Sequence, residues 1–424
     1  ILDLVRQTLI EVKGIKVVHD PAAFRESFHQ IAAEAKSAFG SSDVYLEKFV
    51  QSMRHVEVQI LRDSHGNVKV LGLRDCSVQR NNQKIVEESA STMLPDNLRQ
   101  AVFEHAAAIA DAVDYLGAGT VEFIFDLDAQ AVYFMEMNAR LQIEHPVTEM
   151  VTATDIVPEQ FRIAAGESIQ GLDINEQGHA IELRINAERG ELDTDGNFLL
   201  LPDPGRITAF DFPDDDNIHV LSSVEKDSVV SPYYDSMIIQ LICHGDDRLD
   251  AIDKLRAYLD KATIKGVSTN IPLLKTILDD DTFRNGEYDT GYLPGLIQRI
   301  DVDALIAEMA ASAGARRELG ADAIAIDDSN ELKVLAPSVG LFYLTSSPAE
   351  PAYVTEGAIV GTQDTLCLLE AMKLFRPINL GIFNAAGKTL YDPDRRYRVV
   401  RINQSNGQAV NTGDLLFVIE PVED

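Results

Sequence analysis

The feature that most constrains the fold of this chain is an internal repeat near its C-terminus. Residues 356–370 (EGAIVGTQDTLCLLE) align, 50 residues further on, with residues 406–420 (NGQAVNTGDLLFVIE). Gly, Val, Thr, Asp, Leu and Glu recur at matching places, and each copy reads as a turn, an alternating stretch and an apolar strand. Two similar β halves predict a small, pseudo-symmetric all-β barrel that begins near Glu331. The alternative is two unrelated hairpins, because Gly and Asp are common turn residues.

The first copy of the repeat is followed by a lysine between two apolar residues, in Glu370-Ala371-Met372-Lys373-Leu374. An exposed hairpin fits this position, where Lys373 either presents an attached group or is an ordinary solvated lysine. The string closely resembles the biotinylation motif of biotin carboxyl carrier domains, and residues 336–340 (APSVG) resemble the start of such a domain. Lipoyl domains share the fold, but Met372 favours biotin over lipoate. The extra sequence at residues 380–394 departs from the usual carrier domain.

The rest of the chain has an α/β pattern. Short apolar runs alternate with helical stretches between residues 15 and 149, and strands with a helical stretch at residues 249–262 continue the same catalytic unit to about residue 300. Residues 303–327 are rich in alanine and read as a helix or linker. The predicted divisions are residues 1–149, 150–302, a linker at 303–330, and the small β unit at 331–424.

Three carboxylate and amide side chains are predicted to converge on neighbouring strands. Glu122 lies in a strand-like run at residues 120–125, and Glu136 and Asn138 close the next run, at residues 132–137. Two carboxylates on adjacent strands repel each other unless a cation lies between them. Oxygen ligands of this kind suit Mg²⁺, so these residues are candidate metal ligands.

The segment at residues 138–146 (NARLQIEHP) carries polar groups at every second position. An extended backbone would place Asn138, Arg140, Gln142 and Glu144 on one face. Together with the charged stretch at residues 74–88 (RDCSVQRNNQKIVEE), this string resembles the ATP-grasp core of biotin carboxylases. The resemblance covers nearly all of residues 14–300.

This resemblance implies a role for each matching position. The nucleotide is bound by Glu47, Lys48, Val50, His55, Gln79 and Lys84. Mg²⁺ or Mn²⁺ is held by Glu122, Glu136 and Asn138. Bicarbonate is held by Arg140, Gln142 and the backbone of Ile143. The catalytic residues are Glu144, which deprotonates bicarbonate, Arg184, which stabilises the biotin enolate, Arg140, and Lys84, which neutralises charge near Cys76.

The implied chemistry is the first half-reaction of a biotin-dependent, acyl-CoA type carboxylase. Bicarbonate is a poor nucleophile, so a base and ATP first convert it to carboxyphosphate. The released phosphate can then deprotonate biotin in a site without water, while an arginine stabilises the oxyanion. Biotin on Lys373 and Mg²⁺ are the implied cofactors. The implied partners are ATP, bicarbonate, a carboxyltransferase, a biotin protein ligase and further copies in an oligomer.

Composition excludes several other classes. A formal net charge of −31 disfavours nucleic acid and anionic membranes, so an anionic substrate must meet a local cluster of Lys and Arg. Cys76, Cys243 and Cys367 are too far apart in sequence to indicate a disulfide framework or a Cys-x-x-Cys zinc site, which favours a reducing cytoplasm. The sequence contains no run of eighteen apolar residues, so it does not indicate a membrane-spanning helix.

The chain departs from the family pattern in two places, of which the first bears on nucleotide affinity and the second favours a rival hypothesis. Many biotin carboxylases read Gln-Arg-Arg-His-Gln-Lys where this chain has amides at Asn81 and Asn82, and residues 1–12 contain no glycine where the phosphate-binding loop is expected. We therefore expect the N-terminal domain and two ATP-binding lysines to be absent from the chain as given. The rival is a carrier and assembly scaffold with an inactive ATP-grasp remnant. The acyl acceptor is left open among acyl-CoA thioesters, pyruvate and urea.

Overall fold

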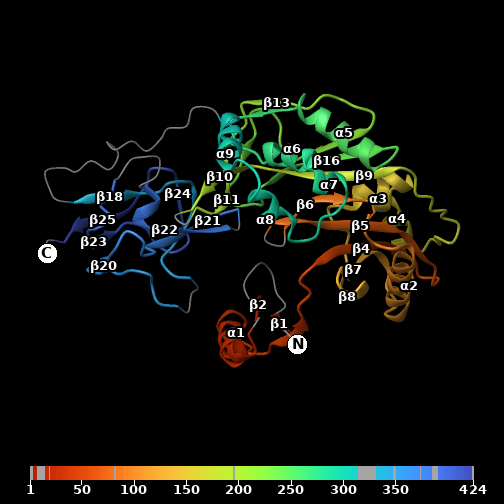
Figure 1. The fold of residues 1–424 in the computed structure, drawn as a ribbon, viewed down its shortest axis with the longest axis horizontal. Coiled ribbons are helices and arrows are strands. Elements are labelled where there is room, and N and C mark those ends of the chain that lie inside the picture. Colours follow the sequence, from red (N-terminus) through yellow and green to blue (C-terminus); the bar gives the residue numbers. More distant parts are fainter. Residues whose placement is uncertain are drawn as a thin grey trace.

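The structure is a computed structural model of the 424-residue chain. It describes residues 3–6, 15–18, 20–80, 83–90, 92–193, 196–313, 331–346, 350–372, 374–383 and 390–422. Residues 20–313 are called the main region below, and residues 331–422 the C-terminal unit. The two lie side by side in Figure 1.

The main region is built on one eight-stranded, antiparallel sheet. Its strand order is β14 (Ile218–Ser222), β16 (Met237–Gly245), β9 (His179–Asn186), β6 (Gln83–Glu88), β5 (Val68–Arg80), β4 (Met53–Arg62), β7 (Gly117–Asp126) and β8 (Ala131–Asn138). Strands from distant parts of the sequence are neighbours, since β6 pairs with β9 through Val86 and Leu183. The sheet therefore brings separate segments of chain to one surface.

Two apolar layers hold this sheet. Val56, Val58 and Ile60 alternate along β4 and pack against α2 (Asp96–Ala112), which presents Val102 and Ala106 from successive turns. At the β9–β16 end, a second cluster packs the sheet against α5 (Arg248–Leu259), α6 (Ile271–Asp279) and α9 (Val302–Ala311). Further helices of the main region are α3 (His145–Thr152), α4 (Ile156–Ala164), α7 (Asp281–Arg284) and α8 (Tyr292–Ile297).

Short hairpins and a small N-terminal sheet complete the described main region and its N-terminal extension. β10 (Glu188–Leu192) pairs with β11 (Phe198–Pro202), β12 (Gly205–Arg206) with β15 (Val229–Val230), and β13 (Ala209–Asp211) with β17 (Thr263–Lys265). The N-terminal sheet has the order β2 (Ile15–Val17), β1 (Asp3–Arg6) and β3 (Tyr45–Lys48). Next to it lie η1 (Pro21–Ala23) and α1 (Phe24–Phe39), at the bottom of Figure 1.

The C-terminal unit consists of two four-stranded antiparallel sheets around their own apolar core. One sheet has the order β18 (Leu332–Leu335), β25 (Leu415–Pro421), β23 (Tyr397–Ile402) and β20 (Ile359–Val360). The other has the order β22 (Leu374–Ile378), β21 (Cys367–Ala371), β19 (Gly340–Tyr343) and β24 (Gln408–Val410), and η3 (Leu380–Phe383) follows β22.

The strand orders of these two sheets show how the repeat is used. In the first copy β20 precedes β21, and in the second β24 precedes β25. Exchanging the two copies, together with β18 for β22 and β19 for β23, converts one strand order into the other. The predicted all-β unit with two equivalent halves is therefore present.

The sheet spans the predicted division between residues 1–149 and 150–302, because β9, β14 and β16 complete the sheet that β4–β8 begin. The predicted linker at 303–330 starts with a packed helix. Leu305 and Met309 of α9 are buried in the same cluster as Leu255 and Leu274, so α9 is part of the main region. Burial of its apolar face, which the alanine-rich composition did not reveal, is the reason.

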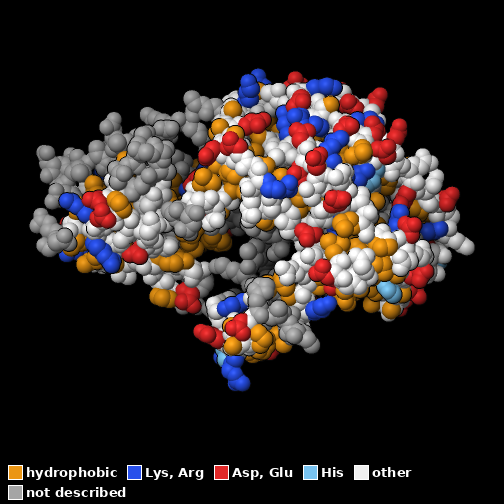
Figure 2. Space-filling model, viewed as in Figure 1, with side chains coloured by type: hydrophobic (Ala, Val, Ile, Leu, Met, Phe, Trp, Pro, Cys, Tyr) orange, Lys and Arg blue, Asp and Glu red, His pale blue; other side chains and the backbone are white. Residues whose placement is uncertain are grey.

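On the face of the molecule that Figure 2 shows, charges of both signs are mixed. Figure 2 shows acidic side chains over the upper face of the main region, interspersed with Lys and Arg. Among the described residues, no helix is both long and apolar enough to cross a membrane.

Candidate active site

The face of the sheet opposite α2 carries polar groups because β4 alternates in character. Val56 and Val58 point to the α2 side, so His55, Glu57 and Gln59 point to the other side. Glu57 and Gln59 are fully buried there. Buried polar groups require partners, and neighbouring strands supply them.

Glu57 is an anion that fixes two cations from β5 and β6. Arg74 donates from Nε to Oε1 of Glu57 at 2.6 Å, and Lys84 donates from Nζ to Oε2 at 2.7 Å. Burial alone would raise the pKa of Glu57, but Arg74 and Lys84 outweigh it and hold that pKa at about 2. Glu57 thus carries its negative charge throughout the physiological pH range.

Glu144 lies between two cations directly before α3. Lys84 donates from Nζ to Oε1 of Glu144, and Arg184 donates from Nη2 to Oε2 at 3.2 Å. Glu144 is 2% exposed and directly precedes the N-terminus of α3. An anionic carboxylate beside two cations can accept a proton from an acid that those cations bind.

Arg184 is also held by Glu87. The Nε of Arg184 donates to Oε1 of Glu87 at 2.6 Å. Burial raises the pKa of Glu87, although Arg184 opposes the shift, and burial raises the pKa of the nearby Glu182 well above its usual range. Glu182 accepts a hydrogen bond from Gln240 Nε2 at 2.8 Å.

The candidate metal ligands meet across β7 and β8. Glu122 and Glu136 are opposite each other in the strand register. Asn138 Nδ2 donates to Oε1 of Glu122 at 2.6 Å and to Oε1 of Glu136 at 3.4 Å, and Gln142 Nε2 donates to the same Glu122 oxygen at 2.8 Å. Two carboxylates with an amide between them are a donor set that fits Mg²⁺ or Mn²⁺.

His55 and Cys76 add potential ligands to this polar surface. His55 Nε2 lies 2.8 Å from Oε2 of Glu122. Burial acts to raise the pKa of Glu122, but the hydrogen bond and charge of His55 outweigh burial and lower this pKa to about 2. His55, Glu57 and Glu122 each place one ligand atom within 4.8 Å of the others, as do Glu57, Cys76 and Glu144. Burial raises the pKa of the Cys76 thiol well above its usual range, so the thiol stays protonated. Lys84, which was predicted to lie near Cys76, acts to lower this pKa but is outweighed.

The predicted nucleotide residues fall into two groups. Gln79 Nε2 lies 2.9 Å from Nδ1 of His55, so these two are part of the polar surface next to Glu122. Glu47 and Lys48 instead belong to β3, in the N-terminal sheet. Lys48 Nζ lies 3.3 Å from Oδ2 of Asp126, at the end of β7, and Val50 follows as a buried residue.

The segment after Asn138 is not extended as predicted. β8 ends at Asn138, and the chain bends and turns before α3. Gln142 and Glu144 are buried and face the site, but Arg140 is exposed and donates only to the carbonyl of Leu141, at 3.2 Å, among the described contacts. The expectation that all four polar side chains share one face is therefore wrong for Arg140. The bend removes the period-two alternation on which it depended.

Ile143 is also partly exposed, at 41%, and its carbonyl accepts a hydrogen bond from Gln240 Nε2 at 2.7 Å. Its backbone N–H is on the turn that leads to Glu144. Lys373, Asn81 and Asn82 lie outside the described residues.

Sequence reasoning missed Glu57, Glu87 and Gln240 as parts of this site. A signal was available for Glu57, since His55, Glu57 and Gln59 recur at every second position within an otherwise apolar run. Glu87 lay in the charged stretch at residues 74–88, but nothing local pairs it with Arg184. Gln240 stands alone in an apolar strand.

Comparison with protein families matches two parts of the main region. Residues 10–172 match the carbamoyl-phosphate synthase L chain, ATP binding domain, and residues 182–295 match the biotin carboxylase C-terminal domain. Biotin carboxylase 2, chloroplastic, of Populus trichocarpa is 45% identical over 284 residues, which are 66% of this chain and 53% of that protein. Biotin carboxylase 1 of Bacillus subtilis (strain 168) is 43% identical over 283 residues, 66% of this chain and 62% of that protein. The chain thus spans little more than half the length of these curated relatives.

Solved structures agree over the same part of the chain. The biotin carboxylase–βγ-ATP complex from Campylobacter jejuni has a TM-score of 0.65 and 37% identity, covering 70% of this chain and 65% of that one. The biotin carboxylase domain of Hydrogenobacter thermophilus 2-oxoglutarate carboxylase, solved with MgADP, ADP and bicarbonate, has a TM-score of 0.65 and 38% identity, covering 71% and 66%.

Proposed function

We propose, from the premise that residues 10–295 of this chain belong to the biotin carboxylase family, that it carboxylates biotin with ATP and bicarbonate and that its C-terminal unit carries the biotin. One observation carries the proposal. The buried carboxylate of Glu144 accepts hydrogen bonds from both Lys84 and Arg184, next to the oxygen ligands of Glu122 and Asn138. A scaffold would gain nothing from this convergence of charges, because buried ion pairs are costly to assemble.

Each charged group has a task in this chemistry. Lys84 and Arg184 attract the bicarbonate anion, and Glu144 accepts its proton, so that a bicarbonate oxygen can attack the γ-phosphorus of ATP. The products are ADP and carboxyphosphate, which breaks down to CO₂ and phosphate. Phosphate then takes the ureido proton of biotin, Arg184 stabilises the enolate oxygen, and the ureido nitrogen attacks CO₂.

The metal ligands and the nucleotide residues support the same reaction. Glu122 and Glu136 would hold Mg²⁺, which neutralises the phosphate charge when bound. His55 and Gln79 lie on the same surface as Glu122 and would contact the nucleotide there. Arg140, exposed in this structure, would bind bicarbonate only after a change of side-chain conformation.

The C-terminal unit would supply the biotin. The predicted attachment site, Lys373, is in the two-residue connection between the paired ends of β21 and β22, Ala371 and Leu374. A biotin protein ligase would modify it, and a carboxyltransferase would accept its carboxyl group.

The test is Glu144→Gln in the full-length protein. An amide of equal size cannot accept the proton, so bicarbonate-dependent ATP cleavage should fall by roughly 10²–10⁴-fold while nucleotide binding persists. Glu149→Gln, on α3, is the matched control, because an amide oxygen can still accept the hydrogen bond that Glu149 takes from the backbone of Ile156. Turnover within about tenfold of the wild type would exclude Glu144 as the base.

A further inference from the structure

We propose that the β10–β11 hairpin and the loop at residues 231–236 form a docking surface for the β21–β22 hairpin of the C-terminal unit. Met372 is the apolar anchor of this contact and Arg376–Glu191 its ion pair. The biotin on this hairpin rests on the function proposed above, whereas the contact itself does not. Figure 1 shows β21 and β22 next to β10 and β11.

Met372 has a backbone conformation and a burial that a free hairpin tip does not explain. It lies in the left-handed region, with φ of 50°, in the two-residue connection between Ala371 and Leu374. Tight hairpins require positive φ, but an unbranched apolar residue has no advantage there over Asn or Gly. The side chain is only 3% exposed, and it belongs to the apolar cluster of the main region that includes Val230 and Ile238. Met372 therefore packs outside its own unit.

A main-chain hydrogen bond fixes the same tip. The N–H of Met372 donates to the carbonyl of Pro232 at 2.7 Å. Pro232 begins a loop in which Tyr233 and Tyr234 are 58% and 74% exposed. Burial of the methionine side chain removes apolar surface from water, so the side chain and the hydrogen bond together form a compact anchor.

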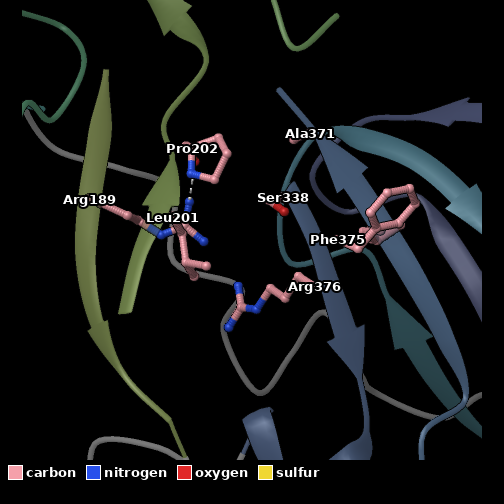
Figure 3. Close-up of a pocket in the computed structure, with 8 residues that line it drawn as sticks. Arg189, Leu201, Pro202, Ser338, Ala371, Phe375 and Arg376 are labelled. Carbon is pink, nitrogen blue, oxygen red and sulfur yellow. Dashed lines mark hydrogen bonds between the residues drawn. The ribbon is translucent and has the colours of Figure 1, made fainter. Parts of the chain in front are cut away.

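An ion pair lies on the other side of the hairpin. Arg376 of β22 donates from Nη2 to Oε1 of Glu191 on β10, and Arg189 Nη2 lies 3.6 Å from Oε2 of the same carboxylate. Figure 3 shows Arg376 and Arg189 pointing into the space between the two units. One carboxylate thus neutralises two guanidinium groups, whose pKa values burial lowers. Removing Glu191 would leave two cations facing each other.

The space between the units is a packing gap rather than a ligand site. Its volume is about 30 Å³, enough for one or two water molecules, and it is lined by residues of both units, including Leu201, Ser338 and Phe375. A biotin ring would not fit there. The contact therefore serves to hold the two units together.

Hydrogen bonds to Glu188 join the docking surface to the end of β5. Arg80 donates two hydrogen bonds to Glu188, at 2.9 and 3.0 Å, and Ser236 Oγ donates a third at 2.7 Å. Glu188 begins β10, two residues after the end of β9, the strand that carries Arg184. The hairpin that docks here carries the predicted biotinylation motif, so we assign the docked state to the carboxylation step.

The contact is tested by charge exchange. Glu191→Lys places three cations together and should raise the hydrogen-exchange rate of the Met372 amide by about tenfold, or about 1.4 kcal/mol of docking free energy. The double variant Glu191→Lys, Arg376→Glu restores one acid between two bases and should return the rate to the wild-type value. Glu225→Lys, an exposed acid outside the contact, should have no effect. An unprotected Met372 amide in the wild type, or a rate that Glu191→Lys leaves unchanged, would refute the docking surface.

Its role is tested by two substrates in the full-length protein. Glu191→Lys should slow carboxylation of the protein's own biotin by about tenfold and leave carboxylation of free biotin unchanged, since Glu191 contacts no active-site residue in the described structure. Equal or faster carboxylation of the attached biotin would overturn the assignment to this step. If the wild type carboxylated neither its own biotin nor free biotin, the proposed function would be wrong. The hydrogen-exchange rate of the Met372 amide would still test the contact by itself.

Discussion

The guanidinium of Arg184 is held by Glu87, whose Oε1 accepts a hydrogen bond from its Nε at 2.6 Å. Nη2 of the same guanidinium contacts Glu87 as well and donates to Oε2 of Glu144 at 3.2 Å. Glu87 does not reach the surface, being fully buried in β6. It acts through Arg184, as a positioning residue.

Glu87→Gln should therefore impair the step that uses Arg184. The amide keeps one hydrogen-bond acceptor but loses the charge that opposes the pull of Glu144 on Arg184. We expect kcat for carboxylation of free biotin to fall by about tenfold, a loss typical of a displaced catalytic group. The apparent affinity for ATP should stay the same, as should all values for Glu104→Gln, on the exposed side of α2. If Glu87→Gln weakened the apparent affinity for ATP as much as it lowered kcat for carboxylation of free biotin, the variant would have a general structural defect.

Acid should destabilise the protein in a defined pH window. Glu57 and Glu122 have folded-state pKa values of about 2, whereas a glutamate in an unfolded chain has a pKa near 4.3. The unfolded state therefore binds more protons between these values, so stability is fully present above about pH 4.5 and is lost as pH falls toward 2. Each group would contribute on the order of 3 kcal/mol.

Urea unfolding at pH 7, 5, 4 and 3 measures this effect. The free energy of unfolding should change little from pH 7 to 5 and then fall steeply. Glu57→Gln should lower stability at pH 7, because Arg74 loses its carboxylate partner, and should make the dependence below pH 4.5 shallower. If the free energy of unfolding fell equally steeply with pH in Glu57→Gln and in the wild type, Glu57 would not titrate with the assigned pKa.

A divalent cation should stabilise the folded chain through Glu122 and Glu136. At ten times its Kd, Mn²⁺ would add about 1.4 kcal/mol to the free energy of unfolding, visible as a rise in Tm. Glu122→Gln and Glu136→Gln should each remove most of this rise, because the cation loses an anionic ligand. Asp128→Asn, in the turn between β7 and β8, is the control. An undiminished rise in both Gln variants would place the cation elsewhere.

Lys373 should carry the biotin. After co-expression with a biotin ligase, intact mass should increase by one biotin and an avidin blot should detect the chain. Lys373→Arg should abolish both signals, since a guanidinium does not form the amide. Lys388→Arg, in the same unit, should abolish neither. Absence of biotin on the wild type, or its persistence on Lys373→Arg, would refute the assignment.

Local patterns in the sequence determined several features of this protein. The repeat at 356–370 and 406–420 predicted two equivalent β halves, which β20–β21 and β24–β25 confirm. Alternation along residues 120–137 placed Glu122 and Glu136 on adjacent strands, and the register confirms this pairing. Such features depend on neighbouring residues, so side-chain periodicity and turn chemistry suffice to reveal them.

Tertiary structure alone decided how the site is assembled and where the two units meet. Lys84 reaches Glu57 and Glu144 across 27 and 60 residues of sequence, and Arg184 reaches Glu144 across 40. The outward turn of Arg140 and the contact of Met372 with Pro232 are equally absent from any local pattern. Sheet order and register follow from how apolar faces pack between layers, a property of the whole chain, and that packing fixes which distant charges are buried together.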